Sequence, residues 1–152
     1  MNELANNENN SRPYMTVTIS SPDGIIYEHR SYSCNVKTTQ GGLTIMPNHI
    51  PILTPLVISA VKVTRVEAGE PVDFIAINGG ILSMANNQLE IISNYAVRAR
   101  DIDEAAVEIQ KQQAEEDMAA ALREKDSRKF KRAKISLERA INKIAVSQQR
   151  RL

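Results

Sequence analysis

The chain has 152 residues, a formal net charge of +1 and 42% apolar residues, enough for a modest core in one compact domain or in a domain with an appendage. Aromatic residues make up 4% and tryptophan is absent, so a stacking surface for single-stranded nucleic acid is not expected. The lone Cys34 cannot form an internal disulfide and no apolar run reaches the roughly 20 residues of a membrane span, which favours a soluble protein of a reducing compartment.

The first 99 residues predict a short tail and then a β-rich domain. Residues 1–13 are rich in Asn and nearly devoid of apolar side chains, which predicts a flexible tail. Residues 16–20 alternate strictly between polar and apolar, and Ser-Pro-Asp-Gly at 21–24 is typical of a turn. Further strand candidates are 25–27, 31–38, 42–46, 53–58, 60–67, 72–78, 80–85 and 88–92. Strands at roughly ten-residue spacing predict an all-β sandwich or barrel.

One position inside this β-rich domain does not fit a regular strand. Gly79 and Gly80 interrupt an apolar strand pattern, and their ordinary explanation is a bulge or a close backbone contact. Cys34 lies in a strand-like run and is expected to be a buried small apolar residue.

At Asp101 the apolar period changes from two to about 3.6. Asp101 followed three residues later by Glu104 is a capping-box pattern, which predicts a helix that begins there. A polar break at 124–127 ends it, and Asp126 or Ser127 can cap a second helix. The apolar face of the first helix is predicted to consist of Ile102, Ala105, Ala106, Ile109, Met118, Ala121 and Leu122. That of the second is predicted to consist of Phe130, Ala133, Leu137, Ala140, Ile141 and Ile144.

The two predicted helices carry opposite charge. Residues 101–126 hold nine acidic and three basic residues, whereas 128–152 hold nine basic residues and Glu138. Such blocks can fold as an antiparallel hairpin, or the basic one can leave and bind another acidic surface. On a helical wheel one group of cations falls in an arc of about 60° opposite the apolar face. This group, the basic stripe, consists of Arg128, Arg132, Arg139 and Lys143.

Other interpretations of the basic stripe are a solvated helix face, a nucleic-acid surface and a membrane surface. The sequence pI of about 7.9 and the lack of a binding motif speak against nucleic acid. The scarcity of aromatic residues on the apolar face speaks against a membrane surface.

Residues with catalytic or metal-binding potential are few. His49 lies between Pro47 and Pro51 and is expected to be a turn or interface residue. His29 is far away in sequence, and no Cys or carboxylate cluster has metal-site spacing. Phosphate-binding loops and nucleophile elbows are absent from the sequence, so no catalytic site, metal or cofactor is expected.

Three segments carry a family resemblance: GLTIMPNHIPILTPL at 42–56, INGGIL at 77–82 and ARDID at 99–103. In this order and spacing the chain resembles the epsilon subunit of bacterial F-type ATP synthase, called delta in mitochondria. The resemblance runs from about residue 15 to 146. It implies an α+β architecture, with a ten-stranded antiparallel β-sandwich over 14–99 and an antiparallel two-helix hairpin over 100–152.

The resemblance implies a non-catalytic subunit of the central stalk, at the cytoplasmic face of the cell membrane as a peripheral part of the complex. Such a subunit contacts the gamma subunit, the ring of c subunits and the alpha/beta catalytic head, and couples ring rotation to proton-driven ATP synthesis. Gln40, Gly41, Gly42 and Leu43 match the loop that faces the c-ring, and His49 lies in the adjacent rotor-contacting turn. Many members carry Glu where this chain has Gln40 and Gly42, which puts an acidic contact with the ring in question.

The resemblance also implies that the hairpin inhibits ATP hydrolysis when it extends into the catalytic head. Basic residues of the last helix then meet an acidic segment of the beta subunit. The expected carriers are Arg128, Lys131, Arg132, Lys134, Arg139 and Lys143. A second hypothesis is a free-standing β-sandwich with a helical lid that senses a nucleotide or another small ligand.

Some family members bind ATP in the folded hairpin through an Ile/Leu-Asp-x-x-Arg-Ala motif. The aligned residues 128–133 read RKFKRA, so Arg132 is kept and Lys129 replaces the Asp. Two other contacts are kept, at Asp103 and Arg139, and three are replaced, at Val97, Ala106 and Lys143. Because an ammonium group cannot reproduce the lost directional hydrogen bonds, we expect weak or absent ATP binding.

Overall fold

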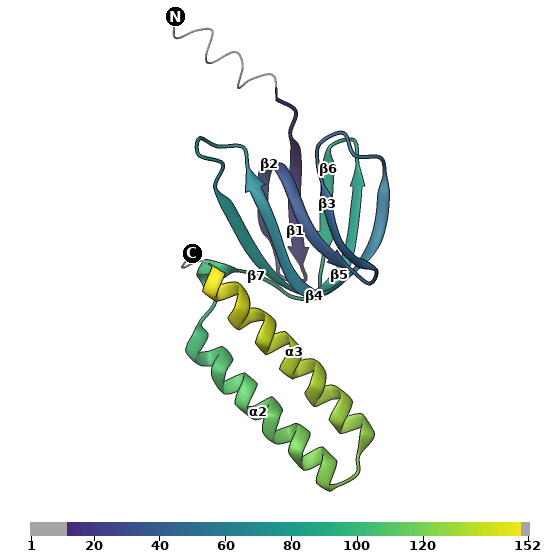
Figure 1. Cartoon of the computed structure of the whole chain (residues 1–152), viewed down its shortest axis with the longest axis vertical. Coiled ribbons are helices and arrows are strands. Elements are labelled where there is room, and N and C mark those ends of the chain that lie inside the picture. The colour runs from purple at the N-terminus through teal and green to yellow at the C-terminus, as the bar shows by residue number, and fades with distance from the viewer. Residues whose placement is uncertain (1–11, 150–152) are drawn as a thin grey trace, which may run out of the picture.

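The computed structural model describes residues 12–149, and most of the tail predicted over 1–13 lies outside that range. A β-barrel-like sandwich and a helical hairpin lie end to end, and the hairpin touches the sandwich at one end only (Figure 1). The strands are β1 (Met15–Ser21), β2 (Gly24–Thr38), β3 (Gly41–Ile45), β4 (Ile52–Arg65), β5 (Val72–Ala85), β6 (Gln88–Ile92) and β7 (Ala96–Arg98). The 3-10 helix η1 (Ala99–Asp101) leads into α2 (Glu104–Arg123) and α3 (Ser127–Gln149).

The strands form one sheet in the order β1-β6-β5-β4-β2-β3, with β7 beside β5. Because β1 also pairs with β2, the sheet closes on itself and encloses a single core. All pairings are antiparallel except β1 with β6, which is parallel. The predicted β-sandwich is therefore present, but the expectation of a purely antiparallel sheet is wrong.

The number of strands is seven within residues 12–149, and the expected ten is wrong. Three observed strands, β2, β4 and β5, each span two of the predicted strands. Each of them bends but does not end between the two predicted segments. The bend in β5 falls at Gly79 and Gly80, whose φ angles of 79° and 143° favour glycine. A Cβ atom on Gly80 would collide with the carbonyl oxygen of Ile92, so this site has the close backbone contact that the sequence indicated.

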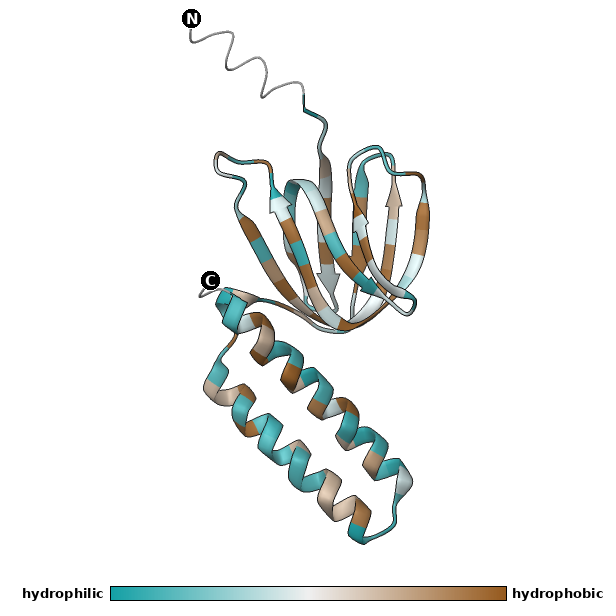
Figure 2. Ribbon diagram, in the orientation of Figure 1, coloured by the Kyte–Doolittle hydropathy of each residue, from teal (hydrophilic) through white to brown (hydrophobic). Residues whose placement is uncertain are grey.

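The core follows from period-two alternation along the strands, visible as alternating bands in Figure 2. In β1, Met15, Val17 and Ile19 are fully buried while the residues between them are partly exposed. Each such side chain contributes about 1.5–3 kcal/mol relative to an exposed position. Cys34 is buried here too, and burial raises the pKa of its thiol to about 12.

The ends of the helices are set by two aspartates. Asp103 caps α2, since its carboxylate accepts a hydrogen bond from the Ala106 amide at 3.2 Å. The prediction of Asp101 as the cap is wrong, because Asp101 belongs to η1. Asp126 caps α3 by accepting from the amides of Arg128 and Lys129, both at 3.1 Å, as one of the two predicted alternatives.

Candidate functional site

The helical hairpin closes along a seam of small side chains. The buried residues of α2 recur every seven positions and are Val107, Ala114 and Ala121. A matching heptad on α3 consists of Ala133, Ala140 and Ser147. Small residues let two helices approach closely, but they bury little apolar area. The hairpin is therefore tight and only modestly stabilised.

The apolar face predicted for α2 is wrong in part. Ala121 lies in the seam, but Ile109 and Leu122 are 68% and 65% exposed. On α3, Ala133 and Ala140 are buried as predicted, whereas Ile141 is 48% exposed. The heptad of small residues decides which face approaches the partner helix, so the larger apolar residues remain at the margins.

The carboxyl-terminal half of α3 attaches the hairpin to the sandwich. The Asn142 side-chain amide donates to the main-chain oxygens of Ser59, at 2.9 Å, and Ile77, at 3.4 Å. One turn further on, Val146 is buried in a small cluster with Ala76 and Ala99. The contact thus includes one polar anchor and one small apolar cluster.

The basic stripe does not lie on one solvated face. Arg128 and Arg132 are exposed, but Arg139 and Lys143 are partly buried where α3 approaches the sandwich. Lys143 Nζ lies 4.2 Å from the centre of the Tyr95 ring. Burial, and secondarily the charge of Arg139, lowers the pKa of Lys143. The prediction that the whole stripe faces away from the packed side is therefore wrong for its second half.

A groove of about 450 Å³ between α2, α3 and the base of β5 holds these two cations. Arg139 Nε is buried without a hydrogen-bond partner among the described residues. Asp117, the carboxylate that lines the groove, accepts a hydrogen bond from Gln113 at 2.9 Å. Of the other candidate carriers on α3, Lys131 and Lys134 are exposed.

The residues of the degenerate nucleotide motif are not gathered in one place. Asp103 lies at the sandwich end of the hairpin, next to Glu104, whose carboxylate accepts a hydrogen bond from Ser147. Arg132 lies about 20 Å away from Ser147 along α3, given a rise of 1.5 Å per residue. Arg139 lies between them. Lys129, in the place of the motif's Asp, donates to Glu124 at 3.0 Å, and this hydrogen bond raises the pKa of Lys129.

The candidate rotor-contacting residues lie at the two ends of β3. Gln40, Gly41 and Gly42 are exposed at the turn between β2 and β3, and Leu43 packs partly against the core. His49 follows the other end of β3, which is about 14 Å long. Two hydrogen bonds fix its loop. The main-chain amide of Asn48 donates to the Asn87 side-chain oxygen at 2.6 Å, and the Asn87 side-chain amide donates to the Asn48 side-chain oxygen at 3.1 Å.

The sequence interpretation missed an exposed apolar surface on the outside of the sandwich. Ile81 of β5 pairs directly with Ile92 of β6, and both side chains are more than half exposed. Leu53 of the adjacent strand β4 extends this surface at 74% exposure, and Ile25 of β2, at 64% exposure, lies beyond Ser20 of β1, which pairs with both Ile25 and Ile92. We call Ile25, Leu53, Ile81 and Ile92 the outer apolar row. The sequence indicates this surface where two consecutive strand residues are both apolar, as in Ile91-Ile92, because one of the two side chains must then face outward.

Two kinds of feature are absent from residues 12–149. No group of three or more His, Cys, Asp or Glu side chains there is arranged to hold a metal ion. None of the helices in that range has the length and apolar character needed to cross a membrane.

Comparison with known proteins gives one family and similar folds. Residues 14–99 match the family model described as ATP synthase, Delta/Epsilon chain, beta-sandwich domain. The chain is similar to a chain in the mitochondrial ATP synthase of Euglena gracilis, solved with OSCP, F1 and the c-ring. That match has 18% identity and a TM-score of 0.73, and covers 87% of this chain and 80% of the other. A chain from the central stalk and c-ring of Tetrahymena thermophila mitochondrial ATP synthase matches at 20% identity and a TM-score of 0.49, covering 57% and 68%.

The match to the Euglena chain extends beyond the sandwich, because it covers 87% of this chain and residues 14–99 make up a smaller part of it. The fold that the two chains share therefore includes part of the helical region.

Proposed function

The chain belongs to the delta/epsilon family of ATP synthase, and from this premise we propose that it is a non-catalytic central-stalk subunit that couples rotation to the catalytic head and restrains ATP hydrolysis. Its partners in this proposal are the gamma subunit, the c-ring and the alpha/beta head. It would lie peripherally at the cytoplasmic face of the cell membrane as part of the complex. The observation that carries the inhibitory part is the weakly attached α3, half of whose basic stripe lies against the sandwich.

The sandwich supplies the rotor contacts in this proposal. The outer apolar row offers a surface that a helix of the gamma subunit could cover, because exposed apolar side chains such as the Ile81–Ile92 pair commonly mark protein contacts. The turn with Gln40 and Gly41 would face the c-ring, and His49 would contact the rotor from the opposite end of β3. With Gln40 and Gly42 in place of Glu, the ring contact would rest on hydrogen bonds and shape.

The hairpin supplies the inhibition. In the folded position, Arg128, Lys131, Arg132 and Lys134 are exposed, while Arg139 and Lys143 are partly covered. Extension of α3 would free the covered pair and present all six cations to an acidic segment of the beta subunit. The attraction of that segment would offset the loss of the Asn142 hydrogen bonds and the Val146 cluster, contacts worth only a few kcal/mol.

ATP is a poor candidate for control of this movement. Lys129 is paired with Glu124, and Asp103 serves as the α2 cap far from Arg132. The carboxylate of the family motif is therefore absent, and that of Asp103 does not lie beside the retained arginine. We expect weak or absent binding, and a micromolar dissociation constant by isothermal titration would contradict this.

The decisive test is ATP hydrolysis by the reconstituted complex with the chain in three forms: wild type, truncated after Arg100, and with α3 locked to the sandwich. For the lock, Ser59→Cys and Asn142→Cys would be joined by a short cleavable thiol cross-linker. We expect truncated and locked forms to give the same raised hydrolysis, and cleavage of the linker to restore inhibition in the locked form. Unchanged hydrolysis in both would defeat the inhibitory role while leaving the rotor role intact.

A charge test asks which cations meet the beta subunit. Replacement of Arg128, Arg132, Arg139 and Lys143 by Ala together should relieve inhibition without loss of assembly. The exposed pair alone, Arg128→Ala with Arg132→Ala, should relieve part of it and leave the folded hairpin unchanged. Lys37→Ala, an exposed cation on β2, serves as the control. Co-purification with gamma and beta separates this function from a free-standing sensor.

A further inference from the structure

The groove between α2, α3 and the base of β5 contains two cations that lie one helical turn apart on α3. Arg139 and Lys143 both line it. Side chains four residues apart share one face of a helix, and two like charges at this spacing repel each other. Neither of the two forms an ion pair with a carboxylate among residues 12–149. Within the described chain, this pair of cations therefore has no counterion.

The carboxylate that lines the groove lies toward the tip of the hairpin. Asp117 also lines the pocket near the turn between the helices, together with Ser136. Ser136 precedes Lys143 by seven residues, which corresponds to about 10 Å along the helix axis. Asp117 accepts a hydrogen bond from Gln113 at 2.9 Å, so its carboxylate is engaged on its own helix.

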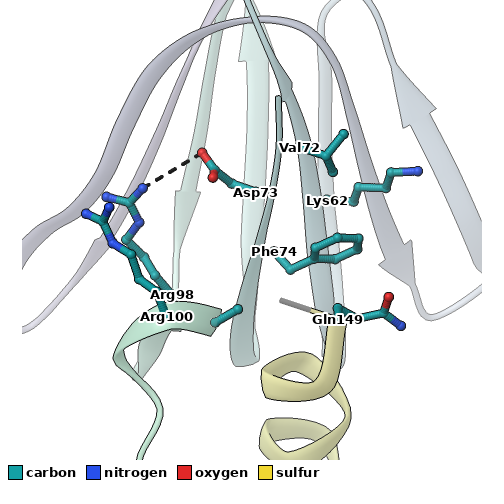
Figure 3. A pocket seen from close by; sticks show the side chains of 8 residues that line it. Lys62, Val72, Asp73, Phe74, Arg98, Arg100 and Gln149 are labelled. Carbon is teal, nitrogen blue, oxygen red and sulfur yellow. Dashed lines mark ion pairs between the residues drawn. The ribbon is translucent and has the colours of Figure 1, made fainter. Parts of the chain in front are cut away.

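A second hollow of similar size, at the carboxyl end of α3, shows what the groove lacks (Figure 3). There Arg98 Nη2 lies 3.8 Å from Asp73 Oδ2, and this ion pair is the dashed line in Figure 3. In the groove, Arg139 Nε is buried without a hydrogen-bond partner among the described residues. Because a buried donor without an acceptor is costly, an anionic acceptor placed beside Arg139 would be stabilised.

The Lys143 amine has the properties of a nucleophile. Its side chain is partly buried, and its Nζ lies 4.2 Å from the centre of the Tyr95 ring. Burial, followed by the charge of Arg139, lowers the pKa of Lys143. The ring favours the charged form only weakly, because Tyr95 is 40% exposed. Desolvation and a neighbouring cation activate a lysine amine, since both raise the fraction with a free lone pair.

We propose that Lys143 is a modification site at which carbon dioxide adds to the amine, and that the resulting carbamate pairs with Arg139. The nitrogen lone pair attacks the carbon of CO2 and forms an N–C bond. One C–O π bond breaks, its electrons pass to that oxygen, and the nitrogen releases a proton to water. Nothing is oxidised or reduced. The carbamate has one negative charge and two oxygens, which match the planar donors of a guanidinium group.

The groove favours CO2 over other reagents that combine with amines. An aldehyde would give an imine, and acyl transfer would give an amide, and neither product has an anionic oxygen for Arg139. A carbamate instead converts two like charges on one helix face into an opposite pair. The atoms of one CO2 molecule are also few for a groove of about 450 Å³.

The modification reverses the charge at one end of the basic stripe. Arg128, Arg132 and Arg139 keep their charges, while residue 143 changes from a cation to an anion. In the proposed function, this change weakens the attraction of α3 for an acidic segment of the beta subunit. That consequence rests on the proposed function, whereas formation of the carbamate does not.

The test incubates the full chain with carbon-13 bicarbonate, which supplies labelled CO2, and traps carbamates by ethylation with triethyloxonium ion before peptide mass spectrometry. We expect about tenfold more label on Lys143 than on Lys134, an exposed cation of the same helix. Arg139→Met should reduce the label on Lys143 about tenfold, as for one lost charge-assisted hydrogen bond. Arg139→Lys keeps the charge but not the planar donors and should also reduce it. The matched control is Lys131→Met, which removes an exposed cation of α3 and should leave the label unchanged.

The comparison within the wild-type chain needs no variant to fold. Equal label on Lys143 and Lys134 would overturn the site, and so would label on Lys143 that Arg139→Met leaves unchanged. Carbamate on Lys143 in a complex whose hydrolysis is unaffected by truncation after Arg100 would refute the proposed function and leave the modification standing.

Discussion

The side chain of Asn142 on α3 donates a hydrogen bond of 2.9 Å to the main-chain oxygen of Ser59 in β4, across 83 residues of sequence. Ser59 lies in the stretch of β4 between Leu56 and Lys62, where the regular pairing with β2 is interrupted. A polar side chain thus contacts the bend of the sheet, and α3 is held at one place on the sandwich.

The first prediction removes this anchor. Asn142→Leu should release α3 from the sandwich, because two main-chain oxygens lose a donor at a cost of about 1–3 kcal/mol. Hydrogen exchange of the α3 amides should accelerate roughly tenfold or more while the core amides of β1 and β6 stay protected. The matched control is Gln148→Leu at an exposed position of the same helix. Equal exchange rates in both variants would show that Asn142 does not anchor the helix.

The second prediction concerns the seam of small residues. Ala140→Leu should separate α2 from α3, because Ala140 is 2% exposed in the seam and overpacking of a buried position costs about 1–3 kcal/mol. Loss of helical circular dichroism at a lower temperature than in the wild type would be the readout. Ala119→Leu adds the same atoms on the exposed face of α2 and should leave the melting temperature unchanged. Equal melting temperatures for the Ala140→Leu and Ala119→Leu variants would mean that the helices are not closely packed at the seam.

The alternation of polar and apolar residues in 16–20 was sufficient to predict β1 and its buried face. The bends of β2, β4 and β5 could not be predicted in the same way, since a bent strand and two short strands have the same local pattern. Gly79 and Gly80 marked the irregularity, but whether the chain continued beyond it depended on pairing with β4.

The helical hairpin and its break were predictable from the change of period and the charge blocks. It could not be predicted that Asp103, and not Asp101, caps α2. Both are good capping residues, and packing outside the helix determines which of them caps it. Ala99 packs against Val146 of α3. Residues 99–101 form a 3-10 helix, so α2 begins after them and not at Asp101. The burial of Arg139 and Lys143 likewise follows from where α3 docks, which a helical wheel does not contain.

The third prediction tests the bend of β5. Gly80→Ala should destabilise the sandwich by about 2 kcal/mol or more, because the new Cβ meets the Ile92 carbonyl and the backbone has a positive φ. Gly69→Ala is a useful comparison, since Gly69 also has a positive φ but open space around its Cβ position. It should cost only about 1 kcal/mol. Urea unfolding of both variants measures the difference, and similar losses would mean that the contact with Ile92 contributes nothing.

The last prediction concerns Tyr27, whose hydroxyl donates to Asp73 at 2.7 Å. Burial, followed by the hydrogen bond and the charge of Asp73, raises the pKa of Tyr27 above its ordinary value of 10.0. The folded protein therefore resists loss of this proton, and the stabilisation is fully present below pH 10. As pH rises above 10, the unfolded chain ionises first and the stabilisation is lost at about 1.4 kcal/mol per pH unit.

Tyr27→Phe lacks this titration and should be less stable than the wild type at pH 7 by about 1.5–3 kcal/mol, the value of a hydrogen bond to a charged group. Between pH 10 and pH 11 the gap between the two proteins should narrow, because only the wild type loses stability through this group. All other titrating side chains are common to both proteins, so the difference in urea unfolding isolates Tyr27. A gap that stays constant from pH 7 to pH 11 would show that the Tyr27 proton is not held by Asp73.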